Sequence, residues 1–191
     1  EQAFAARDSI LGGVLQPAAL DLVNAGAARM LGLDSCCLLV RAQGSPAAIA
    51  RYRSELPEAE MFEGAPEEAL WRKVEEFTPV FLEGHRSACV VRLSATIAGL
   101  AGFLAAQAPV VVRAGSGVCY AYFTDTADAA AWLKDVAVRG GKAVVEFSPQ
   151  DRNASLDLWP SPGNDLEVMK RVKQLFDPRG LLNRGRMYGR F

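Results

Sequence analysis

The chain has little histidine and little cysteine. Among 191 residues it carries one histidine, His85, and four cysteines. A single imidazole cannot build a multi-histidine metal site, and no GxSxG stretch marks a hydrolytic serine. A surface or capping role for His85 is therefore favoured over acid/base work. The cysteines show no CxxC spacing, which favours buried reduced thiols over a metal or disulfide role; they are Cys36, Cys37, Cys89 and Cys119.

Excess charge and a long apolar run are also lacking. The net charge of −1 excludes the global positive field that binds nucleic acid. The longest apolar stretch, Ile97 to Val112, is too short and too interrupted to span a bilayer. No basic start followed by an apolar block marks a secretory signal. The chain opens on Glu1 without a methionine, so we expect a piece of a longer protein.

A glycine-rich phosphate turn after the first strand is missing as well, which argues against a dinucleotide-binding parallel sheet. Helical and strand patterns alternate at short spacing, and several strands are short and half polar. We expect an α+β fold: a ferredoxin-like antiparallel sheet with helices packed on one face, plus a C-terminal helix and a docking tail. The expected strands are 35–44, 59–64, 87–95, two within 109–123, and 142–149, whereas 17–24 is ambiguous between helix and strand.

The same patterns predict the helices. Ser45 is the expected N-cap of one of them, with Pro46 in its first turn. Thr96 is expected to cap another. The expected helices are 1–11, 25–32, 45–56, 65–77, 96–107, 126–140 and 165–176.

Two strands carry an isolated arginine. Arg92 interrupts SACVVRLSA, and Arg113 ends PVVVRAG. Such an arginine is often the polar side of a one-sided sheet. The alternative is an anion site, because a guanidinium meets a carboxylate or phosphate with two parallel hydrogen bonds.

The tail is the most specific stretch. FDPRGLLNRGRMY, Phe176 to Tyr188, places Pro, Gly, Asn and Arg between apolar anchors directly after an expected helix. A disordered tail has a different composition. The tail either folds back on its own domain or docks on a partner domain or an anionic cofactor.

FDPRGLLNRGRMY resembles the closing signature of FAD-linked oxidases of the vanillyl-alcohol oxidase type, which runs helix, Asp-Pro, Gly, Leu-Asn, Pro-Gly-Lys/Arg. RAGSGVCYAYF, LWRKVEEF followed by VVRLSAT, and GGKAVVEFSP before a Trp-Pro resemble further family segments in the right order, as in the glycolate oxidase FAD-binding subunit. The resemblance covers the chain from about Pro17 onward. Where the family usually has proline the chain has Arg184, so the turn is expected to be less rigid.

The resemblance implies a substrate, or cap, domain over residues 1–191, with the N-terminal FAD-binding domain absent from this chain. FAD would be bound mainly by that missing domain, and the parent reaction would oxidise a 2-hydroxy acid such as glycolate to a 2-oxo acid. Asn183, Gly185 and Arg186 would lie on the cofactor side, while Arg92 and Arg113 would face the substrate carboxylate. The resemblance assigns no catalytic residue, and no metal is expected.

The implied partners are the FAD-binding domain of the same parent protein, a small 2-hydroxy acid, and other glycolate oxidase subunits, including an iron–sulfur subunit. The implied location is cytoplasmic, or peripheral to the inner membrane through that complex. Two alternatives stay open. The chain can be a non-catalytic docking module of a multi-subunit oxidoreductase, or a free-standing ferredoxin-like regulator that binds a small acid anion.

Overall fold

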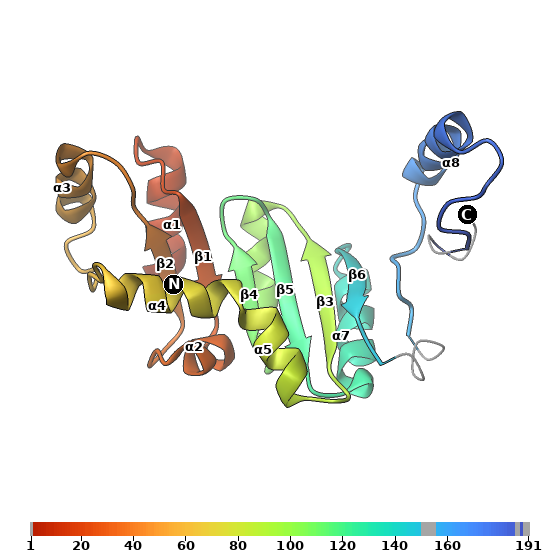
Figure 1. The fold of residues 1–191 in the computed structure, drawn as a ribbon, viewed down its shortest axis with the longest axis horizontal. Helices are drawn as coiled ribbons and strands as arrows, with labels where there is room; N and C mark the ends of the chain where they lie inside the picture. The colour runs from red at the N-terminus through yellow and green to blue at the C-terminus, as the bar shows by residue number, and fades with distance from the viewer. Residues whose placement is uncertain (1, 150–155, 186–187, 189–191) are drawn as a thin grey trace.

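A six-stranded antiparallel sheet forms the centre of the molecule. The computed structural model describes residues 2–149, 156–185 and 188. The strand order is β2-β1-β4-β5-β3-β6, so β2 and β6 are the edges (Figure 1). The strands are β1 (Ala19–Val23), β2 (Cys37–Arg41), β3 (Cys89–Ser94), β4 (Val110–Arg113), β5 (Val118–Phe123) and β6 (Lys142–Phe147).

The β4–β5 hairpin closes through a tight turn, as the sequence predicts. Gly117 has φ +75°, and a Cβ at this position would clash with the carbonyl oxygen of Ala95. The turn therefore requires glycine. The ambiguous segment 17–24 contains β1, which inserts between β2 and β4.

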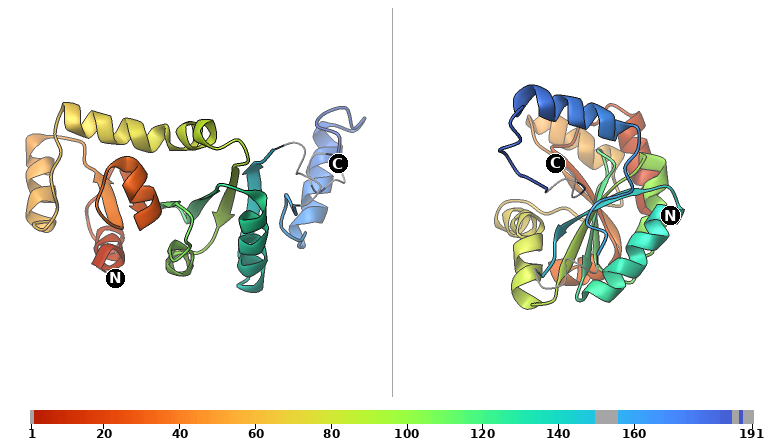
Figure 2. Two further views of the ribbon diagram at one scale, coloured as in Figure 1. Left: turned by 90° about the horizontal axis from the view of Figure 1, so that it is seen from below. Right: turned by 90° about the vertical axis from the view of Figure 1, so that its right-hand side faces the viewer.

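Helices cover both faces of the sheet, so the expectation of helices on one face is wrong (Figure 2). Val90 and Val91 are adjacent in β3 and both fully buried, although their side chains point to opposite faces. A continuous apolar run of this kind requires cover on both sides. The helices are α1 (Gln2–Gly12), α2 (Ala25–Leu31), α3 (Pro46–Glu55), α4 (Ala65–Glu75), α5 (Phe77–Gly84), the 3-10 turn η1 (Ile97–Leu100), α6 (Ala101–Leu104), α7 (Thr126–Val138) and α8 (Asp165–Phe176).

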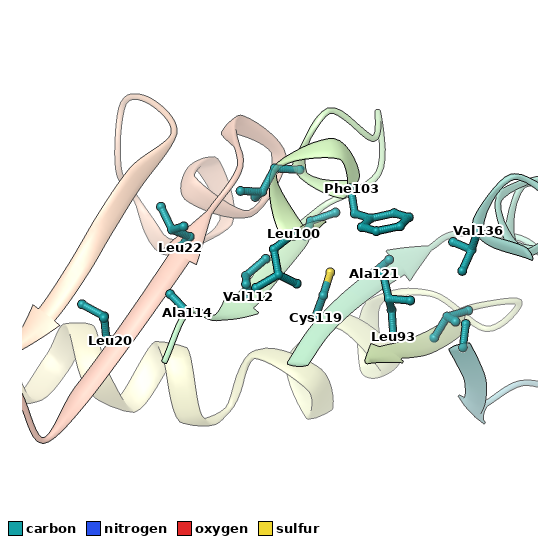
Figure 3. Close-up of a cluster of buried hydrophobic side chains, with 14 of the residues drawn as sticks. Leu20, Leu22, Leu93, Leu100, Phe103, Val112, Ala114, Cys119, Ala121 and Val136 are labelled. Carbon is teal, nitrogen blue, oxygen red and sulfur yellow. The ribbon is translucent and has the colours of Figure 1, made fainter. Parts of the chain in front are cut away.

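The larger core lies on the face covered by α1, η1, α6 and α7. There Leu22, Val112 and Cys119 of the sheet meet Leu100 and Phe103 from the crossover after β3 (Figure 3). A second core on the other face lies under α2, α4 and α5 and is centred on Phe77, Phe81 and Tyr122. The two cores fix the sheet as a rigid platform.

Three further expectations need correction. The segment 59–64 forms no strand, because its residues are exposed and no neighbouring strand pairs with them. A further helix, α5, follows α4 where none was expected. The segment 96–107 is shorter and more broken than one helix, with Thr96 accepting a hydrogen bond from the Gly99 amide as its cap. Ser45 caps α3 as expected, accepting from Ala48 N at 3.3 Å.

Helix α8 and the tail lie beyond β6, and Asp165 at the start of α8 pairs with Lys142 of β6 at 3.2 Å (Figure 1). Leu166 is the buried residue of α8. Met169 is half-buried, whereas the remaining apolar side chains are open, with Val168 60%, Leu175 74% and Phe176 78% exposed. No helix in the described part of the chain combines the length and apolarity needed to cross a membrane.

Candidate functional site

One half of a sheet face is left without a helix over it. Helices α4 and α5 cover the end of the face that carries Val90, Val111 and Tyr122, where the Tyr122 hydroxyl lies 2.8 Å from that of Thr78. At the opposite end, where β4 turns into β5, no helix lies in front of the strands (Figure 1). We call this region the open face.

Strand register places both expected arginines on the open face. Arg92 pairs with Tyr120, and Tyr120 pairs with Val111. Paired residues of antiparallel strands project to the same side, as do residues two apart in one strand. Arg92, Tyr120 and Arg113 therefore share one side of the sheet on three adjacent strands. The open face is defined by Asp21, Arg92, Ser94, Arg113, Tyr120, Lys142 and Glu146.

Arg92 reaches across to the edge strand. Its Nε donates to Glu146 Oε1 at 2.6 Å, and about a third of each side chain is exposed. A half-exposed ion pair of this kind contributes little to stability. The guanidinium has further N–H donors that can bind an anion.

Arg113 is held by a buried carboxylate. Asp21 is 2% exposed and pairs with the Arg113 guanidinium across β1 and β4. Burial raises the pKa of Asp21, and the charge of Arg113 offsets only part of that effect. Arg113 keeps 42% of its side chain exposed, at an open cavity of about 620 Å³ whose lining includes Gln16 and Ser116. Asp21 therefore orients a guanidinium whose other donors remain accessible.

Tyr120 is the residue of this site that our sequence reasoning missed. It is half-buried and stands directly opposite Arg92, one strand from Arg113. The alternation in VCYAYF gives the signal, because Tyr120 and Tyr122 must share a face. Their pairing with Arg92 and Val90 then decides which face that is.

The tail folds around the carboxylate of Asp177. The amides of Leu181 and Leu182 donate to its two oxygens at 2.9 Å each. Lys173 Nζ lies 2.5 Å from Asp177 Oδ2 and donates to the Leu182 carbonyl oxygen. The hydrogen bond from Lys173, with those from the two amides, lowers the pKa of Asp177 to about 2. The Asp-Pro of the motif thus closes a loop as well as ending α8.

Arg184 also closes the turn. Its Nε donates to the Gly180 carbonyl oxygen at 2.6 Å. The Arg184 side chain therefore joins the two ends of the turn by a hydrogen bond, at the position where proline is expected from the resemblance. The expected cofactor-side residues Asn183 and Gly185 flank Arg184 in left-handed backbone conformations, with φ 46° and 68°. Arg186 lies outside the described residues.

These cofactor-side residues do not meet the open face. Figure 1 shows the tail beyond β6, away from β4 and β5, so Asn183 and Gly185 are not brought together with Arg92 and Arg113. Asn183 is exposed, and its amide makes no hydrogen bond to another described residue. An amide that both donates and accepts suits the alternating carbonyl and N–H groups of a flavin ring edge. The Asn183 side chain therefore has the donor and the acceptor that such a ring edge requires.

The histidine and the cysteines have structural places. His85 Nδ1 lies 2.9 Å from the Phe81 carbonyl oxygen, and its ring stacks on Phe81, which confirms the capping role. Burial raises the pKa of Cys89 to about 11 and of Cys119 to about 12, so both are thiols at neutral pH. Cys36 is exposed, so burial does not hold for all four cysteines. Across residues 2–149, 156–185 and 188, no group of three metal-ligating side chains is found.

Comparison with known proteins gives one family match. Residues 161–187 match the model of a family described as FAD linked oxidases, C-terminal domain. The matched segment contains α8 and most of the tail, including the loop around Asp177. A search of curated proteins gives no match. Over these 27 residues the chain is similar to the C-terminal domain of FAD-linked oxidases.

Proposed function

We propose that this chain is the C-terminal substrate, or cap, domain of a glycolate oxidase-type flavoprotein subunit. It would contribute to the FAD-dependent oxidation of a 2-hydroxy acid, with glycolate as the expected substrate, to a 2-oxo acid. The observation that carries the proposal is the family match over residues 161–187, the part of the chain whose apolar side chains are most open. The FAD-binding domain belongs, on this proposal, to the same parent protein.

The open face supports the substrate role. A 2-hydroxy acid presents a carboxylate, and Arg92 and Arg113 offer guanidinium donors on one side of a rigid sheet. Tyr120 stands between them and can donate a hydroxyl hydrogen bond to the same anion. These residues bind and orient the acid.

The tail supports the cofactor role. Asn183, Gly185 and Arg186 would approach FAD bound by the partner domain, and FAD supplies the hydride acceptor when bound. The loop around Asp177 fixes the backbone as far as Leu182, the residue before Asn183. Asn183 would hydrogen-bond the ring edge, and Gly185 permits close backbone approach.

Helix α8 supports docking on the FAD-binding domain. Its exposed apolar side chains lie at helical spacing, so they form one stripe. Two more apolar residues of the tail, Leu181 and Leu182, are also more than half exposed. Apolar surface of this extent is typical of an interface. Other subunits, including an iron–sulfur subunit, complete the proposed complex, which is cytoplasmic or bound to the inner membrane from that side.

The proposed fold of the central unit is ferredoxin-like. Strands β3 to β6 follow the chain order β-α-β-β-α-β and the sheet order β4-β5-β3-β6. Both crossovers, through α6 and α7, pack on the same face. Strands β1 and β2 extend this unit beside β4.

A second candidate is a docking module without substrate turnover. Both arginines already have acid partners, Glu146 and Asp21, as they would in a purely structural role. In that case α8 and the tail would bind a flavoprotein subunit without forming a substrate site.

Co-expression with the FAD-binding domain tests the two candidates. The proposed function predicts a complex that retains FAD and reduces a redox dye when glycolate is added. Binding without dye reduction for any of a panel of 2-hydroxy acids favours the docking module. The absence of any complex contradicts both.

A further inference from the structure

A cavity follows the free edge of the sheet at β2. It encloses about 690 Å³ between β2, helix α3, the segment 56–64 and the start of α4. All residues from Leu38 to Ala42 line it, so side chains from both faces of the strand border the same space. Figure 1 shows α3 standing outside β2, beyond the sheet edge. The cavity therefore runs along the edge of β2, and its volume is typical of a ligand site.

The backbone groups of Leu38 and Val40 point outward at this edge. The Ala18 amide donates to the Arg41 carbonyl oxygen at 2.7 Å, so the backbone groups of Arg41 face β1. Successive residues of an antiparallel strand direct their backbone groups to alternate sides, so Leu39 also faces β1. Within the described part of the chain β1 is the one strand paired with β2, and Leu38 and Val40 therefore have no strand partner. Their two N–H and two C=O groups can bind one more strand.

Apolar side chains line the cavity on both sides of this edge. Tyr52 and Leu56 belong to the core on one face of the sheet, and Leu70 and Trp71 belong to the core on the other. All four line the cavity. An added strand directs its side chains alternately to the two faces. Apolar side chains of such a strand would meet apolar surface on both faces.

The border of the cavity is acidic. The segment 55–68 holds six glutamates and no lysine or arginine. Three of these glutamates pair with Arg41, Arg51 and Arg53. Glu60 lines the cavity, is exposed, and forms no ion pair within the described residues. A cationic segment would be attracted to this border, whereas a second copy of the chain would bring the same negative charge to it.

We propose that β2 is a docking edge for an extended segment of a partner protein, one that carries apolar residues and at least one lysine or arginine. The segment adds a strand to the sheet and exchanges backbone hydrogen bonds with Leu38 and Val40. Its apolar side chains fill the cavity, and its cation lies near Glu60. The site is separate from the open face and from the tail, and it does not depend on the proposed oxidase function.

The test uses the whole chain and a dansyl-labelled, C-terminally amidated peptide of sequence KVTVK, with binding followed by fluorescence anisotropy. We expect saturable binding that slows amide hydrogen exchange at Leu38 and Val40. Exchange at Leu39 should not change, because its amide already faces β1. The same peptide with N-methyl groups on its three central residues keeps its charge but loses the amide donors, and it should bind at least about 5-fold more weakly.

Variants of the chain test the edge and the charge separately. Val40→Pro removes an outward amide without breaking the pairing to β1, so it should weaken binding at least about 5-fold and leave the sheet folded. Glu60→Gln should weaken binding about 2- to 5-fold. Glu68→Gln is the matched control, because Glu68 is an exposed acid outside the cavity lining, and it should leave binding unchanged.

Four outcomes would overturn the proposal. Absence of saturable binding removes the docking edge. Equal binding of the N-methylated peptide, or unchanged exchange at Leu38 and Val40, contradicts strand addition. Equal binding of the peptide EVTVE contradicts a cationic partner. A dimer of the chain alone that Val40→Pro dissociates in sedimentation would make a second copy the occupant.

Discussion

Replacing Arg92 by alanine separates a substrate role from a structural one. Its ion pair with Glu146 is about one-third exposed on both sides, and such pairs contribute about 0.2–1 kcal/mol to the free energy of unfolding. For a chain of this size, 1 kcal/mol corresponds to a Tm change of about 2–4 °C. A substrate carboxylate bound by the same guanidinium is worth about 1.5–3 kcal/mol. Losing 1.5–3 kcal/mol of substrate binding corresponds to about a 10- to 150-fold loss of kcat/KM.

We therefore expect Arg92→Ala to lower Tm by at most about 4 °C and kcat/KM for glycolate by at least about 10-fold. Tm is measured on the isolated chain, and kcat/KM on its complex with the FAD-binding domain. Arg51→Ala is the matched control, because Arg51 pairs with Glu55 at 2.7 Å on the exposed surface of α3, outside the open face. It should reproduce the small Tm change and leave kcat/KM unaltered. A larger Tm loss together with unchanged kcat/KM would refute the substrate role of Arg92.

Three further predictions concern the buried carboxylate and the tail. Burial raises the pKa of Asp21 above its ordinary value of 3.8, so the contribution of Asp21 to the free energy of unfolding falls as pH rises through the folded pKa. Asp21→Asn should remove this pH dependence and be at least as stable as the wild type in urea unfolding at neutral pH. A marked loss of stability in Asp21→Asn would contradict the reasoning. Because the folded pKa of Asp177 is about 2, the loop around Asp177 should be fully formed above pH about 4 and lost as pH falls through about 2. The amide NMR signals of Leu181 and Leu182, followed against pH, measure this transition. A transition midpoint near pH 4 would show that the loop does not form. Deleting residues 179–191 should leave the Tm of the sheet within about 2 °C but abolish binding to the FAD-binding domain; unfolding would show that the tail belongs to the core.

Local signals predicted much of the fold. The β4–β5 hairpin follows from two apolar runs around a glycine turn, and α3 follows from Ser45 and Pro46. The prediction of a strand at 59–64 was wrong, because an alternating pattern forms a strand only where a neighbouring strand pairs with it. The second layer of helices was not predicted because several half-polar strands favour a one-sided sheet, whereas the apolar run of β3 is buried on both faces.

The candidate site shows the same limit. The sequence identified Arg92 and Arg113 as isolated cations in strands, and the motif identified the tail. Their common side of the sheet depends on pairing between β3, β5 and β4, which no local pattern contains. The buried partner of Arg113 is Asp21, 92 positions away in the chain and on a strand that was ambiguous in sequence. Pairings between residues so far apart in the chain can be recognised only from the structure.

The most direct test of the account is the absorbance of the flavin in the complex of this chain with its FAD-binding domain, recorded without oxygen as glycolate is added. The proposed function predicts that the band of the oxidised flavin bleaches, and that the rate falls at least about 10-fold when Arg92 and Arg113 are both replaced by alanine. A flavin that bleaches at the same rate with the doubly substituted chain, or without this chain, would contradict it.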